Sequence, residues 1–313
     1  MPALSLLLLL FLQACHRAPP TIALVPRTTG MVLWEAAHAG AAQIARREGF
    51  SLYYNAPTRE DEVSSQIKII NDALRKGIAG LIVCPIEALP LRTTVRNAIA
   101  EGIPTVVVGT DLGIPTNPKL GYVLSNEELA GALAARRIGF ILHGKGQIAI
   151  VGINYQLTST AARERSLEAV LAKEFPQIRV AIRRLGFPTV PQEQQSAEEL
   201  VNQAEHVDAI VALSHISTRG AYYALAEFNK TATTKLLGFD QELLSPLRTG
   251  GIDSVVFQDT YGLGQEAMKS IVGQIRGEKI SSRVILDPVL VTRENLDSAR
   301  VRQLATLAWW SDQ

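Results

Sequence analysis

Residues 21–54, TIALVPRTTGMVLWEAAHAGAAQIARREGFSLYY, contain the pattern that decides the fold. The apolar run Thr21–Val25 predicts a strand, the longer amphipathic segment Met31–Glu48 predicts a helix, and Ser51–Tyr54 predicts a second strand. Gly49 follows the helix directly, where glycine adopts the left-handed conformation without Cβ strain. Strands that are apolar on both faces and joined by helices predict a parallel sheet with helices on both sides.

The same alternation continues through the rest of the chain and restarts once, near residue 127. Two doubly wound α/β units of similar size are therefore expected, with parallel-sheet lobes and a ligand site in the cleft between the carboxyl ends of their strands. The further strands are expected at Ala79–Val83, Thr105–Val108, Gln147–Val151, Val180–Arg183, Ala209–Leu213, Lys235–Leu237, Asp253–Phe257 and Val284–Val291. The further helices are expected at Glu60–Lys76, Leu89–Glu101, Glu127–His143, Thr160–Phe175, Gln192–Ala204, Thr218–Phe228, Tyr261–Arg276 and Arg293–Trp310.

Composition excludes several classes of protein. The 313 residues carry a net charge of +1, so there is no strong positive field with which to bind nucleic acid. A hydrophobic fraction of 47% is too high for a disordered chain, and the length suggests about two domains. Two cysteines exclude a disulfide scaffold, and Cys84, which lies in an apolar strand, is expected to be a buried free thiol.

The first residues of the chain predict export. Leu6–Leu12 is an unbroken apolar run, too short to span a bilayer but suited to a signal peptide. It ends in Leu12-Gln13-Ala14-Cys15, which resembles the bacterial lipobox. We therefore expect residues 1–14 to be a lipoprotein signal peptide, Cys15 to carry a lipid that anchors the protein on the periplasmic side of the membrane, and residues 15–20 to be a tether. An ordinary secretory signal with a coincidental cysteine is the alternative.

Six fragments give the chain a family resemblance through both their order and their spacing. They are Ile22-Ala23-Leu24-Val25, Gly40-Ala41-Ala42, Gly102-Ile103-Pro104, Thr158-Ser159-Thr160-Ala161-Ala162-Arg163-Glu164-Arg165, Gly238-Phe239-Asp240 and Val255-Val256-Phe257-Gln258-Asp259. With them, the region from Thr21 to Val291 resembles a type I periplasmic solute-binding protein of the ribose/galactose-binding group, which has the LacI-like effector fold.

The resemblance implies a three-segment hinge that crosses near Leu124–Ser125, Gln258–Asp259 and Leu286–Asp287. The lobes would then be residues 21–124 with 259–285, and residues 125–258 with 286–313. It also implies a monomer that closes around a monosaccharide-like ligand and delivers it to an ABC permease in the inner membrane. A sensor that presents the sugar to a membrane receptor kinase would use the same site, and remains an alternative.

The resemblance also implies which residues bind the ligand. Arg163, Asp240 and Gln258 match the family's polar sugar contacts, and Leu33 with Trp34 takes the place of its stacking aromatic pair. These residue types suit a sugar, because charged planar groups bind hydroxyls and aromatic rings pack on the C–H face. Phe187 would be a lid aromatic from the second lobe. Each of these residues also has an alternative role. Arg163 would cap the preceding turn or pair with Glu164, and Asp240 would be a turn residue. Gln258 would only satisfy backbone groups at the hinge, and Trp34 would belong to the core.

Three positions depart from the family pattern. Arg27 stands where ribose binders have a small hydroxyl residue, Asp111 is displaced by two residues, and Ser214 with His215 replaces an Asn-Asp pair. Arg27, Asp111 and Ser214 are nevertheless candidate ligand residues. Two guanidiniums, Arg27 and Arg163, in one cleft would favour an acidic ligand such as a sugar acid, unless Arg27 pairs with Glu35 or Asp111 or points to solvent.

No pattern of catalysis is present in the sequence, so we expect neither an enzyme nor a bound cofactor or metal. The histidines His38, His143, His206 and His215 lie in separate elements without HExxH spacing, and the chain contains neither a GxSxG elbow nor a P-loop. The effector domain of a LacI-like repressor shares the fold, but the apolar leader in place of a helix-turn-helix favours the exported protein.

Overall fold

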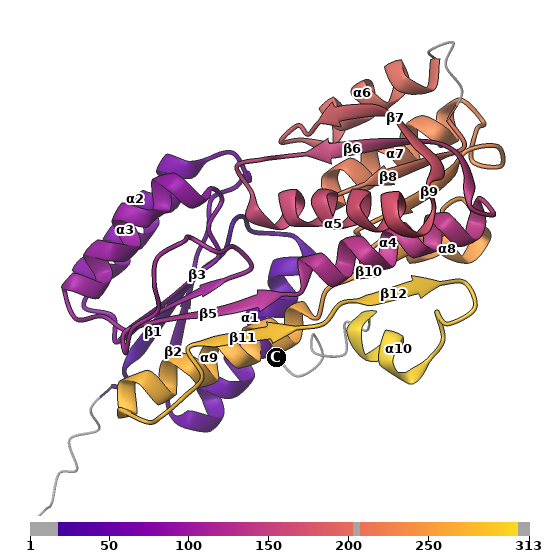
Figure 1. The fold of residues 1–313 in the computed structure, drawn as a ribbon. Helices are drawn as coiled ribbons and strands as arrows, with labels where there is room; N and C mark the ends of the chain where they lie inside the picture. The colour runs from indigo at the N-terminus through magenta and orange to yellow at the C-terminus, as the bar shows by residue number, and fades with distance from the viewer. Residues whose placement is uncertain (1–17, 203–206, 306–313) are drawn as a thin grey trace, which may run out of the picture.

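The structure is a computed structural model that describes residues 18–202 and 207–305. In this part of the chain, two six-stranded sheets covered by helices form two lobes, which lie beside each other in Figure 1. The predicted α/β architecture of two lobes is confirmed. The predicted signal peptide, Cys15 and the end of the predicted tail helix lie outside the described residues.

The first sheet is entirely parallel in the described chain. Its strands are β1 (Thr21–Val25), β2 (Ser51–Tyr54), β3 (Gly80–Val83), β4 (Thr105–Val108), β5 (Leu120–Ser125) and β11 (Arg283–Leu286). They lie in the order β11-β5-β4-β3-β1-β2. Strands β3 and β4 are buried along their whole length, whereas the edge strand β2 is half-buried. Strand β5 was not predicted, because a glycine interrupts its apolar run and its partner β11 is remote in the sequence.

The second sheet contains one antiparallel pair. Its strands are β6 (Lys145–Ile153), β7 (Gln177–Leu185), β8 (Ala209–Ala212), β9 (Lys235–Gly238), β10 (Ser254–Phe257) and β12 (Val289–Thr292). They lie in the order β12-β10-β9-β8-β6-β7, and β12 runs antiparallel to β10. The single strand predicted over Val284–Val291 is therefore wrong. Asp287 and Pro288 interrupt it, so that β11 pairs in the first sheet and β12 in the second.

Helices cover both sheets. They are α1 (Val32–Glu48), α2 (Val63–Arg75), α3 (Ala88–Ala100), α4 (Glu127–Ile141), α5 (Thr158–Glu174), α6 (Val190–Asn202), α7 (His215–Glu227), α8 (Leu244–Thr249), α9 (Thr260–Arg276) and α10 (Ala299–Ala305). The predicted glycine after the first helix has a left-handed φ of 80° at Gly49. Two helix starts differ from prediction in ways that matter for the site: Glu60 lies in a loop before α2, and α7 begins at His215 instead of Thr218.

Within the described chain, three segments pass between the sheets: after β5, after β10 and between β11 and β12. They lie where the resemblance implies hinges. Asn126 caps α4 by accepting from Leu129 N, and Asp259 caps α9 by accepting from Gly262 N. The side-chain amide of Asn126 also donates to Asp287 at 2.9 Å, which ties two of the segments together. Bending at these segments stays a prediction.

Helix α9 returns the chain to the first lobe and packs against α1 through glycines. The orange α9 and the yellow β11 lie beside the indigo and purple elements of that lobe in Figure 1. A Cβ on Gly264 would lie 1.9 Å from the carbonyl oxygen of Ala37, and one on Gly40 would lie 2.1 Å from that of Tyr261. The two helices can therefore approach this closely only because both positions lack a side chain.

Cys84 is a free, fully buried thiol at the end of β3, as predicted. Burial raises its pKa to about 12, which keeps it protonated and unreactive. Among the helices of the described ranges, none combines the length and the apolar character needed to cross a membrane.

Candidate functional site

A cavity of about 310 Å³ lies between the two lobes, next to the carboxyl ends of their strands. It is near the lower end of the roughly 300–1,000 Å³ typical of small-molecule sites. A much smaller cavity shares part of its lining, including Leu33, His215 and Gln258. Eight of the nine predicted ligand residues line one or both cavities: Arg27, Leu33, Trp34, Arg163, Phe187, Ser214, Asp240 and Gln258. That they bind a ligand stays a prediction.

Arg27, in the loop after β1, lines the larger cavity and is held by neutral partners. Its Nε donates to the carbonyl of Pro85 at 2.9 Å, and its Nη2 donates to the hydroxyl of Thr110 at 2.7 Å. Neither predicted alternative partner, Glu35 or Asp111, pairs with it. The guanidinium therefore keeps its positive charge at the cleft without a carboxylate partner in the described chain.

Trp34 belongs both to the core of the first lobe and to the cavity wall. Its side chain is 5% exposed, and its indole Nε1 donates to Glu60 Oε1 at 3.1 Å. This hydrogen bond positions the Glu60 carboxylate at the cavity. Glu60 was not predicted to lie at the site, because a helix was expected to begin at that residue.

On the opposite wall, Arg163 of α5 is buried and neutralised. Its Nε lies 2.5 Å from Glu127 Oε2, its Nη1 donates to the carbonyl of Leu213 at 2.7 Å, and its guanidinium lies 4.3 Å from the ring centre of Phe239. The predicted alternative pairing with Glu164 does not occur. Glu127, at the start of α4, was missed because its partners come from helices and strands that are distant in sequence.

The Glu127 carboxylate also holds the predicted hinge glutamine. Its Oε1 accepts from Gln258 Nε2 at 2.8 Å, so one carboxylate orients both Gln258 and Arg163. Within the described residues, the amide oxygen of Gln258 and the Nη2 of Arg163 make no hydrogen bond. One acceptor and one donor at the cavity are thus left available to a ligand.

Asp240 is less available than predicted. Its carboxylate accepts from Arg219 at 2.6 and 3.3 Å and from the backbone N–H of Glu242 at 2.8 Å, and the residue is only 3% exposed. It lines the smaller cavity only. Arg219 also lies 2.7 Å from Glu242, and it was missed because only the fold brings α7 next to the end of β9.

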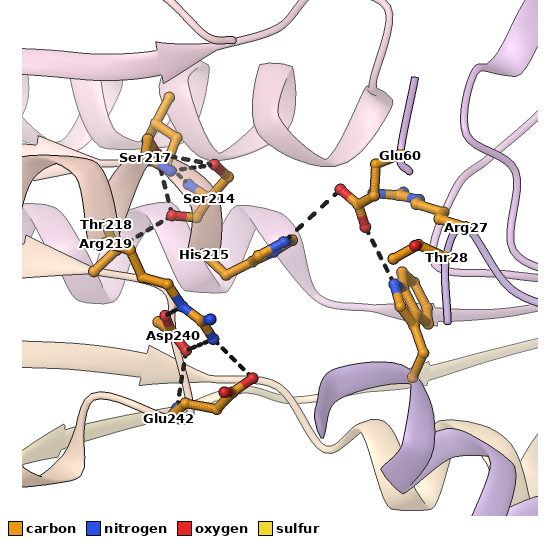
Figure 2. Close-up of polar contacts among 12 residues, drawn as sticks. Arg27, Thr28, Glu60, Ser214, His215, Ser217, Thr218, Arg219, Asp240 and Glu242 are labelled. Atoms are coloured by element: carbon orange, nitrogen blue, oxygen red, sulfur yellow. Dashed lines mark hydrogen bonds and ion pairs between the residues drawn. The ribbon is translucent and has the colours of Figure 1, made fainter. Parts of the chain in front are cut away.

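Ser214 and His215 begin α7 at the cavity. The Ser214 hydroxyl accepts from Ser217 N as part of a capping box, so it serves the helix as well as facing the cavity. Figure 2 shows His215 pointing across the cleft toward Glu60, with Nε2 3.8 Å from Glu60 Oε2. Burial lowers the pKa of His215, so the imidazole is neutral at neutral pH. His215 was not among the predicted ligand residues.

Phe187 stands at the cavity mouth, 44% exposed, in the loop between β7 and α6. Its backbone N–H donates to Glu193 Oε1 at 2.9 Å. Glu193 is 3% exposed, and burial raises its pKa to about 7. A buried carboxyl group that was not predicted thus anchors the loop that carries Phe187.

Asp111 lies outside the lining of both cavities, contrary to its predicted place in the site. Its Oδ2 lies 2.7 Å from Arg283, and its Oδ1 accepts from Gly113 N at 2.7 Å. The two extra residues after β4 carry it past the strand end, where its backbone N–H donates to Thr158 of the second lobe.

The charges at the larger cavity do not support an acidic ligand. Five acidic side chains line it against two guanidiniums in the described chain; Arg163 is paired with Glu127, Asp61 is paired with Arg59, and burial raises the pKa of Glu193 to about 7. Arg163 therefore does not favour an acidic ligand, because Glu127 already compensates its charge. The carboxylates are Glu60, Asp61, Glu87, Glu127 and Glu193. Among the described residues, no group of His, Cys, Asp and Glu is placed to hold a metal ion.

Comparison with known proteins agrees with the geometry. A family model for the periplasmic binding protein domain matches residues 22–279. A putative rhizopine-binding protein of Rhizobium meliloti is 27% identical over 251 residues, covering 75% of this chain and 78% of that protein. A D-ribose/D-allose-binding protein of Pseudomonas aeruginosa is 23% identical over 278 residues, covering 82% and 83%.

Solved structures show the same fold. A carbohydrate transporter solute-binding protein from Agrobacterium radiobacter, in complex with D-arabinose, has a TM-score of 0.86 at 21% identity and covers 92% of this chain and 99% of its own. An ABC transporter solute-binding protein from Bacillus halodurans with bound myo-inositol has a TM-score of 0.80 at 20% identity, covering 90% and 98%. The chain thus belongs to the periplasmic binding protein family, whose members bind solutes and catalyse no reaction on them.

Proposed function

We propose that this protein is the extracytoplasmic sugar-binding component of an ABC importer, which traps a neutral monosaccharide-like or polyol ligand between its lobes. The observation that carries this proposal is the cavity of about 310 Å³ between the lobes. Side chains from both lobes line it, and they include an indole, charged planar groups and a side-chain amide. Closure around the ligand would follow from contacts that only the closed form makes.

The chemistry of the lining supports a polyhydroxylated ligand. Each hydroxyl both donates and accepts, and the cavity offers donors from Arg27 and Arg163 and acceptors from Glu60 and Gln258. The indole of Trp34 offers an apolar face for C–H groups. The excess of carboxylates favours a neutral ligand over a sugar acid.

The relatives support the same class of ligand. Their names specify rhizopine and D-ribose or D-allose, and similar solved structures contain D-arabinose and myo-inositol. We extend only the class to this chain: a small polyhydroxylated ring or chain. Delivery to an inner-membrane permease, anchoring through a lipid on Cys15 and a monomeric state belong to the same proposal.

A ligand screen by thermal shift and calorimetry tests the proposal. The panel contains D-ribose, D-allose, D-arabinose, D-tagatose, xylitol and myo-inositol, with D-galacturonate as the acidic comparison. A ligand at about 100 times its Kd should add about 2.7 kcal/mol to the free energy of unfolding. Binding of a neutral member with a preference over the uronate is expected. Failure of every neutral member to bind would overturn the proposal.

A further inference from the structure

Glu60 and His215 face each other across the cleft from opposite lobes. Glu60 lies in the loop between β2 and α2 of the first lobe, and His215 is the first residue of α7 in the second. The distance from Glu60 Oε2 to His215 Nε2 is 3.8 Å, and both residues line the larger cavity. Figure 2 shows the two side chains pointing toward each other. The sequence resemblance assigns neither residue to the ligand.

Each side chain is held in place from behind. Glu60 is 13% exposed, and its Oε1 accepts from Trp34 Nε1 at 3.1 Å, which leaves Oε2 free to face the second lobe. His215 is 14% exposed, and the capping box of Ser214 fixes the turn from which it projects. These restraints hold Glu60 Oε2 and His215 Nε2 so that both atoms face the same part of the cavity.

His215 Nε2 is a buried polar atom without a hydrogen-bond partner in the described chain. Leaving such an atom unsatisfied costs free energy, so a partner from outside the protein is to be expected. Its separation from Glu60 is too long for a direct hydrogen bond. A single oxygen making two hydrogen bonds of about 2.8 Å at a tetrahedral angle would span about 4.6 Å, so a slight opening of the lobes admits one hydroxyl.

The charges around His215 suit such a contact. Burial lowers its pKa, with Arg219 and Arg27 acting in the same direction and Glu60 and Asp240 opposing them. A neutral imidazole has one N–H to donate, and the Glu60 carboxylate can only accept. A hydroxyl, which accepts and donates at once, satisfies both.

We propose that Glu60 and His215 together bind one hydroxyl of the ligand, which accepts a hydrogen bond from His215 Nε2 and donates one to Glu60 Oε2. This inference rests on the proposed function, and it identifies one hydroxyl of the polyol as the group that both lobes bind. Because the contact needs both lobes, it forms only when they close to a separation slightly wider than the 3.8 Å between these two atoms in this structure, and it makes closure depend on that hydroxyl.

The contact is tested by measuring how tightly the wild-type protein and each variant bind the ligand and its analogues, in the manner of a double-mutant cycle. The probes are the tightest-binding neutral member of the panel above and its monodeoxy analogues, measured by calorimetry. In Glu60→Gln, the amide oxygen must accept from Trp34 Nε1, so the amide NH₂ faces His215 and the oxygen acceptor for the ligand hydroxyl is lost. His215→Phe keeps an aromatic ring but removes Nε2. Each variant should bind the parent ligand about tenfold or more weakly.

One monodeoxy analogue should bind the wild-type protein about tenfold or more weakly than the parent, and both variants should lose that discrimination. The double variant should lose little more than either single one. His215→Gln, whose amide nitrogen approximates Nε2, should recover part of the affinity. The exposed residues Glu101 and His143 supply the controls Glu101→Gln and His143→Asn, and ligand-free thermal unfolding checks that each variant folds.

The outcomes separate the two proposals. Wild-type binding with both variants within about twofold of it would overturn this inference alone. So would variants that weaken every analogue equally, because the pair would then be a latch between the lobes without a ligand hydroxyl. If the wild-type protein bound no member of the panel, the proposed function and this inference would both fail.

Discussion

The carboxylate of Glu127 lies 2.5 Å from Nε of Arg163, and both side chains are less than a tenth exposed. Glu127 comes directly after the first crossing between the lobes, and its other oxygen accepts from Gln258 at the second crossing. The pair therefore joins the cavity wall to two of the segments between the lobes. Removing only one partner of a buried ion pair is strongly destabilising, because the other charge stays buried without compensation.

Replacement of Glu127 by alanine should leave the Arg163 guanidinium buried without a counter-charge. We expect the free energy of unfolding to fall by about 3–5 kcal/mol, measured by urea denaturation at neutral pH. The matched control is Glu174→Ala, which removes a partner of Arg136 from a much more exposed pair and should cost at most about 1 kcal/mol. Equal losses in the two variants would contradict a special role for the buried pair.

Trp34→Phe keeps an aromatic ring at the cavity but removes the N–H that orients Glu60. Ligand binding should weaken by about 1.5–3 kcal/mol, the scale of one hydrogen bond to a charged acceptor, and Trp34→Ala should weaken it further because the apolar face is lost. Calorimetry with the tightest-binding sugar or polyol measures both. Tyr223→Phe, at an exposed tyrosine outside the cavity lining, should bind as the wild type does.

Glu193→Gln should change the pH dependence of stability. Burial raises the pKa of Glu193 from 4.5 to about 7, so the folded protein holds this proton more tightly than the unfolded chain. The resulting stability is fully present below about pH 4.5 and is lost as the pH rises through 7, a change of at most about 3 kcal/mol.

Glutamine stays neutral and still accepts from Phe187 N, so the variant should gain stability relative to the wild type between pH 4.5 and 8. Thermal unfolding across this range measures the difference. Glu199→Gln, at an exposed position of the same helix, provides the comparison and should show no such trend. A constant difference for Glu193→Gln would refute the raised pKa.

Gly264→Ala should destabilise the first lobe. The added Cβ would meet the backbone carbonyl of Ala37, which cannot move aside as a flexible side chain would. We expect a loss of about 3 kcal/mol or more in the free energy of unfolding, at the upper end for overpacked cores. Lys269→Ala, at an exposed position of α9, should change stability by less than about 0.5 kcal/mol and controls for helix propensity. A tolerated Gly264→Ala would mean that α1 and α9 can separate.

Local pattern was enough to predict most elements because strands and helices in this fold differ in length and periodicity. It failed where a partner is distant. Strand β5 is defined by pairing with β11, and the segment Val284–Val291 divides because its halves join different sheets. The helix expected from Glu60 begins three residues later, which releases Glu60 into the cleft.

The hydrophobic pattern of the sequence by itself determined the two-lobed α/β class, because the ends of strands and helices can be located from it. The resemblance to a family, which the order and spacing of six sequence fragments carry, implied the three crossings and the eight residues that line the cavities. Only the tertiary structure decided which charges compensate one another. Glu127 neutralises Arg163, and Arg219 neutralises Asp240. Each of these pairs joins elements remote in sequence, and the energy of a charge depends on the distance to its partner in space.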